Sequence, residues 1–319
     1  MESVNCNICQ NSDTQVLFSK KDKFGISVDD FTVVKCKKCG LIYVNPRPSE
    51  QEIIKFYPET YSWKETLQAG SLFTRIVRRL EKAYRYHLLN YEVNRVLKFT
   101  RCSSGRVLDI GCGSGDRLSV FRDNGFEAYG VEISPAARYA KEKLKLDVFE
   151  GDLYKANYPG DFFDIVTMYS VLEHLHNPKE LLFEVRRILK REGFLIVQVP
   201  NTESLQFRIF KDKWSAFDVP RDLYYFNISL LNRILSNSGF KCYLIDHSVN
   251  WWHPPTIVIT LFPQLDPQLS WLKEKQKKNP VFKRAFWIFW TLSLGAFTFI
   301  ESSMKRGAII NFYSKKVST

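Results

Sequence analysis

The sequence of 319 residues predicts an α/β fold, in which helices cover both faces of a mostly parallel sheet. Two observations predict this class. Short apolar runs alternate with helical patterns after Arg106, and a glycine-rich turn follows the first of these runs. The composition, 45% apolar and 25% charged, is that of a folded protein and excludes the disordered, collagen-like and disulfide-scaffold classes. A chain of this length can bury a substantial core without cross-links.

The expected strands and helices follow one another along the middle of the chain. Apolar runs typical of buried strands occur at 107–110, 128–131, 164–168 and 194–199. Helical patterns lie between them, at 117–124, 135–143 and 179–190. The apolar run at 308–313 is expected to return to the sheet as its last strand. We therefore predict one α/β domain formed by residues 105–249 and 306–319.

Three further segments surround this domain. Residues 1–60 contain paired cysteines and are predicted to form a zinc-binding module. Residues 61–104 are expected to form an amphipathic helical linker of one or two helices, because apolar residues recur at helical spacing from Leu72 to Leu97. Residues 250–305 are rich in Trp, Phe, Pro and Lys, which predicts a basic, aromatic, helical insertion.

The cysteines of the first segment form two Cys-x-x-Cys pairs, Cys6 with Cys9 and Cys36 with Cys39. Four thiolates in this pattern predict a tetrahedral zinc site, although a redox pair or ordinary buried cysteines would use the same residues. The long gap between the pairs is explained by a β-hairpin, and 32–35 and 41–44 read as strands beside the second pair. A site closed by four sulfurs has no open position, so the zinc is expected to be structural.

The first residues, Met1 to Cys6, have neither a cationic start nor an apolar stretch, so we expect no signal peptide and a cytoplasmic protein. Cysteines in a reducing compartment are expected to stay unpaired, which favours the metal site over disulfides. No run reaches the roughly 18 apolar residues of a membrane-spanning helix.

The glycine-rich turn reads Asp109-Ile110-Gly111-Cys112-Gly113-Ser114-Gly115 and comes directly after the first strand. Asp116 stands where a phosphate-binding fingerprint has a further glycine, which favours a ligand with an adenosine part and no phosphates. Glu132 ends the second strand, where a carboxylate accepts from ribose hydroxyls, and Ile133 follows it to pack on a purine. Asp152 ends the next strand and is placed to accept from the adenine amino group.

These motifs resemble the class I S-adenosylmethionine-dependent methyltransferases. The resemblance covers roughly 106–239 with the final strand, and it includes the turn just described, Phe163-Asp164-Ile165-Val166, Val171-Leu172-Glu173-His174-Leu175, 189–195 and Ser238-Gly239-Phe240. It implies a Rossmann-like sheet of seven strands with the last antiparallel, and S-adenosylmethionine as the cofactor. The residues implied to bind this cofactor are Asp109, Gly111, Gly113, Gly115, Glu132, Ile133, Asp152, Leu153 and Met168.

Methyl transfer from a sulfonium needs little side-chain chemistry beyond alignment of the reacting atoms in a dry pocket. A hydroxyl or acidic carbon acceptor would benefit from a general base, and His174 is the best-placed candidate. The alternative is that His174 positions a loop. Glu173 would then either orient the imidazole or cap the loop.

The paired cysteines, the stretch Gly40-Leu41-Ile42-Tyr43-Val44-Asn45-Pro46-Arg47-Pro48 and the methyltransferase motifs together resemble the methyltransferases of bacterial surface-polysaccharide and sugar-nucleotide pathways. This resemblance implies a small or lipid-linked sugar acceptor. Trp214, Arg221 and Tyr224 are candidates to bind it, with lid packing as the alternative. Asp222 stands where relatives commonly have His, which puts an acid–base role for that position in doubt.

Two other acceptors are considered. An RNA methyltransferase would use basic charge to bind phosphates, but 168–172 lack the Asn/Asp-Pro-Pro-aromatic signature and the cations do not cluster in the zinc module, which disfavours nucleic acid. Quinone-pathway O-methylation shares the sheet motifs but leaves the cysteines unexplained.

The net charge of +12 is concentrated near the end of the chain, where ten Lys and Arg but only two acidic residues, Glu274 and Glu301, occur from Trp271 onward. Residues 285–300 carry no charge and include Trp287 and Trp290. We expect 281–304 to form one helix at the inner face of an anionic membrane, flanked by Lys277, Lys278, Lys283, Arg284, Lys305 and Arg306. The alternative is an insertion that packs on the protein or forms a dimer contact.

Overall fold

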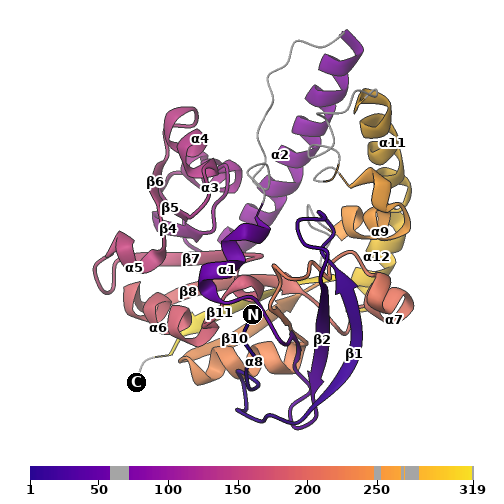
Figure 1. Cartoon of the computed structure of the whole chain (residues 1–319). Coiled ribbons are helices and arrows are strands. Elements are labelled where there is room, and N and C mark those ends of the chain that lie inside the picture. The colour runs from indigo at the N-terminus through magenta and orange to yellow at the C-terminus, as the bar shows by residue number, and fades with distance from the viewer. Residues whose placement is uncertain (58–71, 248–252, 267–268, 270–279, 318–319) are drawn as a thin grey trace.

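The computed structural model describes residues 1–57, 72–247, 253–266, 269 and 280–317 (Figure 1). Within these residues the chain forms a central sheet of seven strands, a smaller sheet of four strands and a set of C-terminal helices. Helices lie on both faces of the central sheet, as the alternation of patterns predicts (Figure 1).

The central sheet contains the predicted strands and extends most of them by a few residues. Its strands are β4 Gly105–Ile110, β5 Phe126–Glu132, β6 Asp147–Glu150, β7 Phe163–Tyr169, β8 Leu189–Pro200, β10 Phe240–Asp246 and β11 Ile309–Lys316. Their order is β10-β11-β8-β7-β4-β5-β6. Strand β11 is antiparallel to both of its neighbours, which confirms the seven-stranded sheet with an antiparallel last strand.

Alternate residues of each inner strand enter different layers of the core. Leu108 and Val166 belong to the layer under helices α5 Leu153–Ala156, α6 Pro178–Ile188 and α8 Ile228–Asn237. Val107 and Ile165 belong to the layer under α2 Leu72–Thr100, α3 Asp116–Asp123 and α4 Ala136–Glu142. Both faces are therefore buried, as expected of a parallel sheet, and the carboxyl ends of β4, β5 and β7 meet at one edge.

The N-terminal segment forms the second sheet, in the order β1-β2-β3-β9. Its elements are β1 Thr14–Lys21, β2 Asp30–Cys36, β3 Ile42–Val44, β9 Tyr224–Tyr225, α1 Glu50–Ile53 and η1 Ile54–Phe56. The antiparallel pair β1 and β2 is the hairpin expected between the cysteine pairs. Strand β9 was not predicted; it comes from the segment after the fifth strand of the large sheet and pairs Tyr225 with Ile42.

The C-terminal insertion differs from the prediction of one helix over 281–304. Two helices form instead, α11 Pro280–Ser293 and α12 Gly295–Ser303, with a turn at Leu294. Glycine at the first position of α12 is a poor helix former, which explains why the break falls there. The remaining elements are α7 Leu205–Phe210, η3 Lys211–Lys213, α9 His253–Leu261 and η4 Pro263–Leu265. No helix among the described residues is long and apolar enough to cross a membrane.

The indole rings of the insertion are also placed differently from the prediction. Trp287 was expected at a membrane interface, but it is buried among Ile257, Val258 and Leu265. Trp290 is half-buried, with its ring centroid 5.1 Å from that of Phe262. The packing alternative therefore describes this face of α11. Lys277 and Lys278 lie outside the described residues, as do the side chains of Lys283 and Arg284.

Candidate active site

The glycine-rich turn joins β4 to α3 in a conformation that side chains rarely adopt. Gly111 and Gly113 have φ angles of 69° and 55°, in the left-handed region that favours glycine. A Cβ on Gly111 would lie 2.6 Å from Val171 Cγ2, whereas a Cβ on Gly113 would have no heavy atom within 4 Å. The turn is therefore packed against the protein at Gly111 and open at Gly113, where a ligand could approach the backbone. Gly115, with φ 79°, precedes α3.

Glu132 at the end of β5 fixes this turn. One carboxylate oxygen accepts from the Gly113 N–H at 2.8 Å, and the other accepts from the Ser134 N–H at 2.7 Å. A carboxylate has about four lone-pair sites, so each oxygen can still accept a ligand hydroxyl. Ile133 follows with 69% of its surface exposed and supplies an apolar side chain beside the turn. This arrangement suits the predicted ribose and purine contacts.

Asp109 is buried at the end of β4, and its two oxygens differ in their partners. Oδ1 accepts from the Thr167 hydroxyl at 2.6 Å, whereas Oδ2 has no hydrogen-bond partner within the described part of the chain. Burial raises the pKa of Asp109 to about 6, against the lowering effects of the Arg117 charge and the Thr167 hydrogen bond. A buried acceptor without a partner is costly, and a donor group of a bound ligand would satisfy it.

The other predicted cofactor residues are either bonded within the protein or buried. Asp152 caps helix α5, because Oδ1 accepts from the Lys155 N–H at 2.9 Å and Oδ2 lies 2.9 Å from the Lys155 ammonium. Leu153 and Met168 are buried at the ends of neighbouring elements. Their contacts with an adenine remain predictions.

His174 lies at the end of the short helix η2, Leu172–His174, which follows β7. Nδ1 is 3.0 Å from Asp222 Oδ1 and 3.1 Å from the carbonyl oxygen of Arg221. Burial alone lowers the pKa of His174, but the hydrogen bond and charge of Asp222 outweigh it and raise the pKa to about 9. Val171, on the same segment, is the residue that contacts Gly111. The segment that carries His174 therefore begins next to Gly111.

Asp222, and not Glu173, is the hydrogen-bond partner of His174. Glu173 was expected to orient the imidazole or cap the loop. Glu173 is buried, and its backbone carbonyl accepts from the Leu223 N–H at 2.8 Å, which joins the two segments. Burial raises the pKa of Glu173 to about 7. The residue type at position 222 left a role for that position in doubt, and no local pattern pointed to this pairing.

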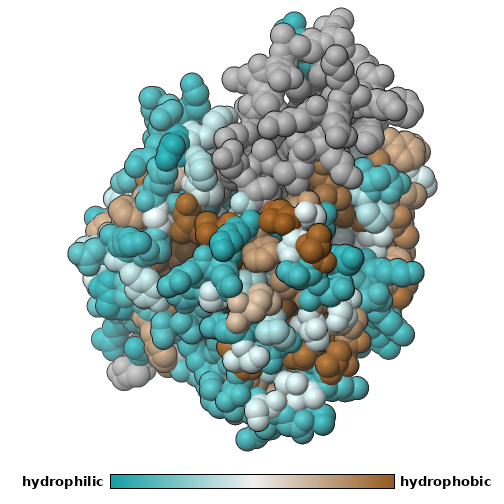
Figure 2. Space-filling model, in the orientation of Figure 1, coloured by the Kyte–Doolittle hydropathy of each residue, from teal (hydrophilic) through white to brown (hydrophobic). Residues whose placement is uncertain are grey.

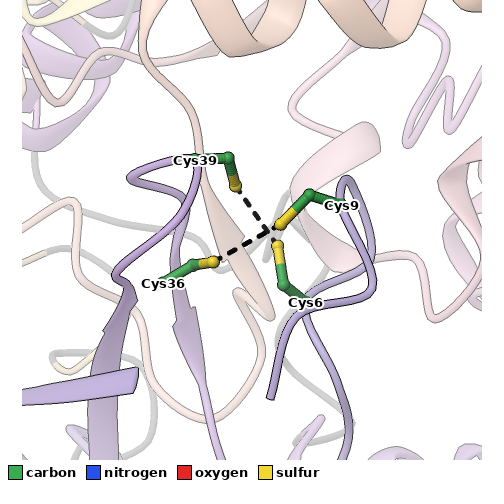
Figure 3. A group of neighbouring side chains, drawn as sticks. All are labelled: Cys6, Cys9, Cys36 and Cys39. Atoms are coloured by element: carbon green, nitrogen blue, oxygen red, sulfur yellow. Dashed lines mark hydrogen bonds between the residues drawn. The ribbon is translucent and has the colours of Figure 1, made fainter. Parts of the chain in front are cut away.

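The four paired cysteines converge from two loops, with their sulfurs pointing toward one another (Figure 3). All four Sγ atoms lie within 4.8 Å of one another. The short contacts join different pairs, Cys6 to Cys39 at 3.4 Å and Cys9 to Cys36 at 3.5 Å. Sulfurs around a tetrahedral zinc, at about 2.3 Å from the metal, lie about 3.8 Å apart, whereas a disulfide needs about 2.05 Å. The cluster therefore fits a metal ion, and all four cysteines are free thiols.

Backbone N–H groups favour the thiolate form of Cys36, whereas burial raises the pKa values of Cys6 and Cys39. Burial raises the pKa of Cys36, but hydrogen bonds from the N–H groups of Cys39 and Lys38 outweigh it and lower the pKa to about 6. Thiolates are the form of cysteine that binds metals.

Comparison with known proteins identifies the larger domain. A family model described as a methyltransferase domain matches residues 82–245. The chain belongs to this methyltransferase family. A relative from Mycolicibacterium smegmatis, named a probable S-adenosylmethionine-dependent methyltransferase, is 27% identical over 44% of this chain and 54% of its own length. The mitochondrial ubiquinone biosynthesis O-methyltransferase of Schizosaccharomyces pombe is 31% identical over 35% of this chain and 45% of its own length.

The solved structures agree on the fold. The crystal structure of the cyclase SpnF has a TM-score of 0.50 and 19% identity, and the alignment covers 72% of this chain and 81% of that one. Likeness at this level shows the fold alone. The chain spans about half the length of the two relatives above.

The cysteine module of this methyltransferase is joined to the His174 segment by hydrogen bonds. Tyr224 accepts from Asn7 Nδ2 at 2.9 Å and from the Arg47 guanidinium at 2.6 Å, and it donates to the carbonyl oxygen of His176 at 3.2 Å. His176 in turn donates through Nε2 to the carbonyl oxygen of Pro48 at 2.9 Å. The module therefore holds the loop that begins two residues after His174.

The three candidate sugar-binding residues are placed in the core instead. Trp214 is buried and donates through Nε1 to Gln206 Oε1 at 3.3 Å. Arg221 is buried between the carboxylates of Asp22 and Asp218. Tyr224 is buried in the network just described. The packing alternative accounts for all three, because their polar atoms are used by protein partners and their side chains are not exposed to a substrate.

Proposed function

We propose that this methyltransferase transfers a methyl group from S-adenosylmethionine to a hydroxyl of a small or lipid-linked sugar of a surface glycan. The observation that carries the proposal is the His174–Asp222 pair, on a segment in which Val171 lies next to Gly111 and His176 is hydrogen-bonded to the Pro48 carbonyl. We place the activity in the cytoplasm, where free thiols persist.

S-adenosylmethionine, when bound, supplies an electrophilic methyl group on a sulfonium. The residues that would hold it are Glu132, through its free lone pairs, Asp109, through Oδ2, and the open backbone at Gly113. Because Nδ1 of His174 is held by Asp222, Nε2 is the nitrogen that would take the proton of an acceptor hydroxyl.

We also propose that the cysteine cluster holds a structural zinc ion. Four sulfurs leave no open coordination position for a substrate, and the pattern of short contacts across the two pairs suits a tetrahedral ion. Zinc would hold the two loops of the module together, and through Arg47 and Asn7 it would support the His174 segment.

Mass spectrometry of surface glycans tests the acceptor. Glycans from cells with the gene, without it, and with only a Glu132→Ala copy are compared. We expect one sugar to lose a methyl mass in the second and third samples. Unchanged glycans together with a lost ribosomal RNA methyl group, or with accumulation of an unmethylated quinone precursor, would refute the sugar proposal while leaving the methyltransferase assignment intact. The quinone outcome has support from the fission yeast relative.

The pH dependence of methyl transfer tests the role of His174. Only a neutral imidazole accepts a proton, so kcat/KM is expected to rise with pH until the pKa near 9 is passed. Asp222→Asn removes the charge that raises the pKa of His174, and burial then lowers this pKa. The rise of kcat/KM should therefore occur at a pH lower by at least about one unit.

Glu173→Gln is the matched control, because Glu173 affects His174 through charge and not through a hydrogen bond. We expect this variant to shift the rise of kcat/KM along the pH scale by less than Asp222→Asn does. A kcat/KM that stays flat between about pH 6 and 9 in the wild type would exclude His174 as the base.

A further inference from the structure

Exposed apolar side chains lie on both α11 and α12, before and after the turn at Leu294. Six of them are between 40% and 68% exposed. We call these residues the outer stripe: Phe286, Phe289, Leu292, Phe299, Ile300 and Met304. Figure 2 shows hydrophobic surface along the margin formed by these helices. Contiguous exposed apolar surface of this kind marks an interaction site.

The opposite side of the same helices is already packed. Trp287 is buried against α9, and Thr298 and Glu301 are buried as well. The helices are therefore anchored to the protein by one face, and the outer stripe is not the side that the fold uses. This separation leaves the stripe available to a partner without any rearrangement of the core.

The exposed serine hydroxyls of these helices are satisfied by the helices themselves. Ser293 donates to the Phe289 carbonyl at 2.8 Å, and Ser303 donates to the Phe299 carbonyl at 2.9 Å. Glu301 is fully buried, and its carboxylate accepts from the backbone and side chain of Gln206. Hydroxyls bonded to the preceding turn can enter an apolar medium at little cost. No carboxylate is exposed among described residues 286–304.

Basic residues occur at both ends of this stretch of the sequence. Lys305 and Arg306 are exposed directly after Met304, and the sequence has Lys283 and Arg284 just before Phe286. A pocket between α12 and α2 adjoins the stripe, and its lining includes Phe299, Lys305 and His87. An apolar surface with cations at both ends and no exposed carboxylate is complementary to anionic lipid headgroups above acyl chains.

We propose that the outer stripe binds the surface of an anionic membrane, with its apolar side chains at the boundary between headgroups and acyl chains. Both helices lie in the plane of the interface and neither crosses it. The proposal that this surface binds lipid depends only on the residues of the outer stripe and its neighbours. Its use in bringing the enzyme to a lipid-linked sugar rests on the proposed function.

Flotation of the full-length protein with vesicles tests the proposal. Vesicles containing phosphatidylglycerol are compared with vesicles of phosphatidylcholine alone. We expect binding to the anionic vesicles that weakens as salt rises from about 0.05 M to about 0.5 M, because screening shortens the reach of the cations. The triple variant Phe289→Ser, Leu292→Ser, Phe299→Ser should lower the partition coefficient by at least about tenfold.

A matched triple variant controls for the loss of exposed apolar side chains in general. Val28→Ser, Phe183→Ser and Tyr243→Ser replace similarly exposed residues on other parts of the molecule, and this variant should bind vesicles as the wild type does. A second variant, Lys305→Ala with Arg306→Ala, should lower binding to anionic vesicles by about tenfold without affecting thermal stability. Binding of S-adenosylmethionine should be retained in all three variants and shows that each is folded.

Three results would overturn the proposal. Wild-type protein that stays unbound with anionic vesicles at low salt excludes it. Equal loss of binding in the stripe variant and the matched variant shows that the stripe has no special role. Sedimentation velocity could instead show a dimer. If the stripe substitutions dissociate that dimer and lipid does not change it, the surface is assigned to a second copy of the chain. Vesicle binding with unchanged glycans would instead leave the membrane proposal in place and refute the proposed acceptor.

Discussion

We expect Glu132→Ala to abolish measurable binding of S-adenosylmethionine. The substitution removes the acceptor for ribose hydroxyls and also the two backbone hydrogen bonds, to Gly113 and Ser134, that hold the turn. Hydrogen bonds to a charged group are worth about 1.5–3 kcal/mol each, so losing two or more lowers affinity by at least about a hundredfold. Isothermal titration calorimetry with the wild type and the variant measures the change.

Glu127→Ala is the matched control, since Glu127 lies on the same strand but is exposed and contacts only Arg106 and Tyr129 at the surface. Its affinity should equal that of the wild type. Glu132→Gln keeps an acceptor oxygen and loses the charge, so its affinity should fall between the two. Retained affinity in a folded Glu132→Ala protein would mean that the cofactor binds elsewhere.

The central sheet could be predicted because its determinants are local. Each strand is a short apolar run, and each helix between strands has its own periodic pattern, so the order of elements alone defines the parallel core. The order of the elements also predicts that the turn at Gly111 and the carboxylate of Glu132 lie close together, because the ends of neighbouring parallel strands share one edge of the sheet. The antiparallel last strand came from the family resemblance and is confirmed by its pairing with β8.

The parts that sequence reasoning missed depend on contacts between distant segments. Strand β9 exists because Tyr224 and Tyr225 pair with β3, which lies far away in the chain. The same contact turns Arg221 inward to Asp22, which removes it from the candidate substrate site. Asp222 reaches His174 for the same reason. No local pattern in a single sequence records such pairings.

These distant contacts also connect the cysteine cluster to the segment that contains His174 and His176. Asn7, between Cys6 and Cys9, donates to the His176 carbonyl at 3.1 Å and to Tyr224. Arg47, after β3, does the same with its guanidinium. Loss of order in the cysteine loops would therefore release the His174 segment from one side.

We expect Cys36→Ser to lose the bound zinc and most of the methyl-transfer activity while retaining S-adenosylmethionine binding. Zinc supplies much of the folding free energy of a small module, and a hydroxyl is a far poorer ligand than a thiolate. The cofactor residues lie on the central sheet, whereas Asn7 and Arg47 belong to the module that would become disordered. Elemental analysis should find about one zinc per chain in the wild type and almost none in the variant.

Hydrogen exchange shows which segments of Cys36→Ser lose order, and substitutions of cysteines outside the cluster serve as controls. Amides of residues 1–57 should exchange faster in Cys36→Ser, and those of β4 and β5 should not change, because the sheet has its own core. Cys102→Ser and Cys242→Ser replace half-buried thiols outside the cluster and should keep the metal, the exchange pattern and the activity. A metal-free wild type that is folded and fully active would contradict the zinc proposal. Loss of metal without loss of methyl transfer would instead show that the His174 segment does not depend on the ion, because the hydrogen bonds from Asn7 and Arg47 would then persist without it.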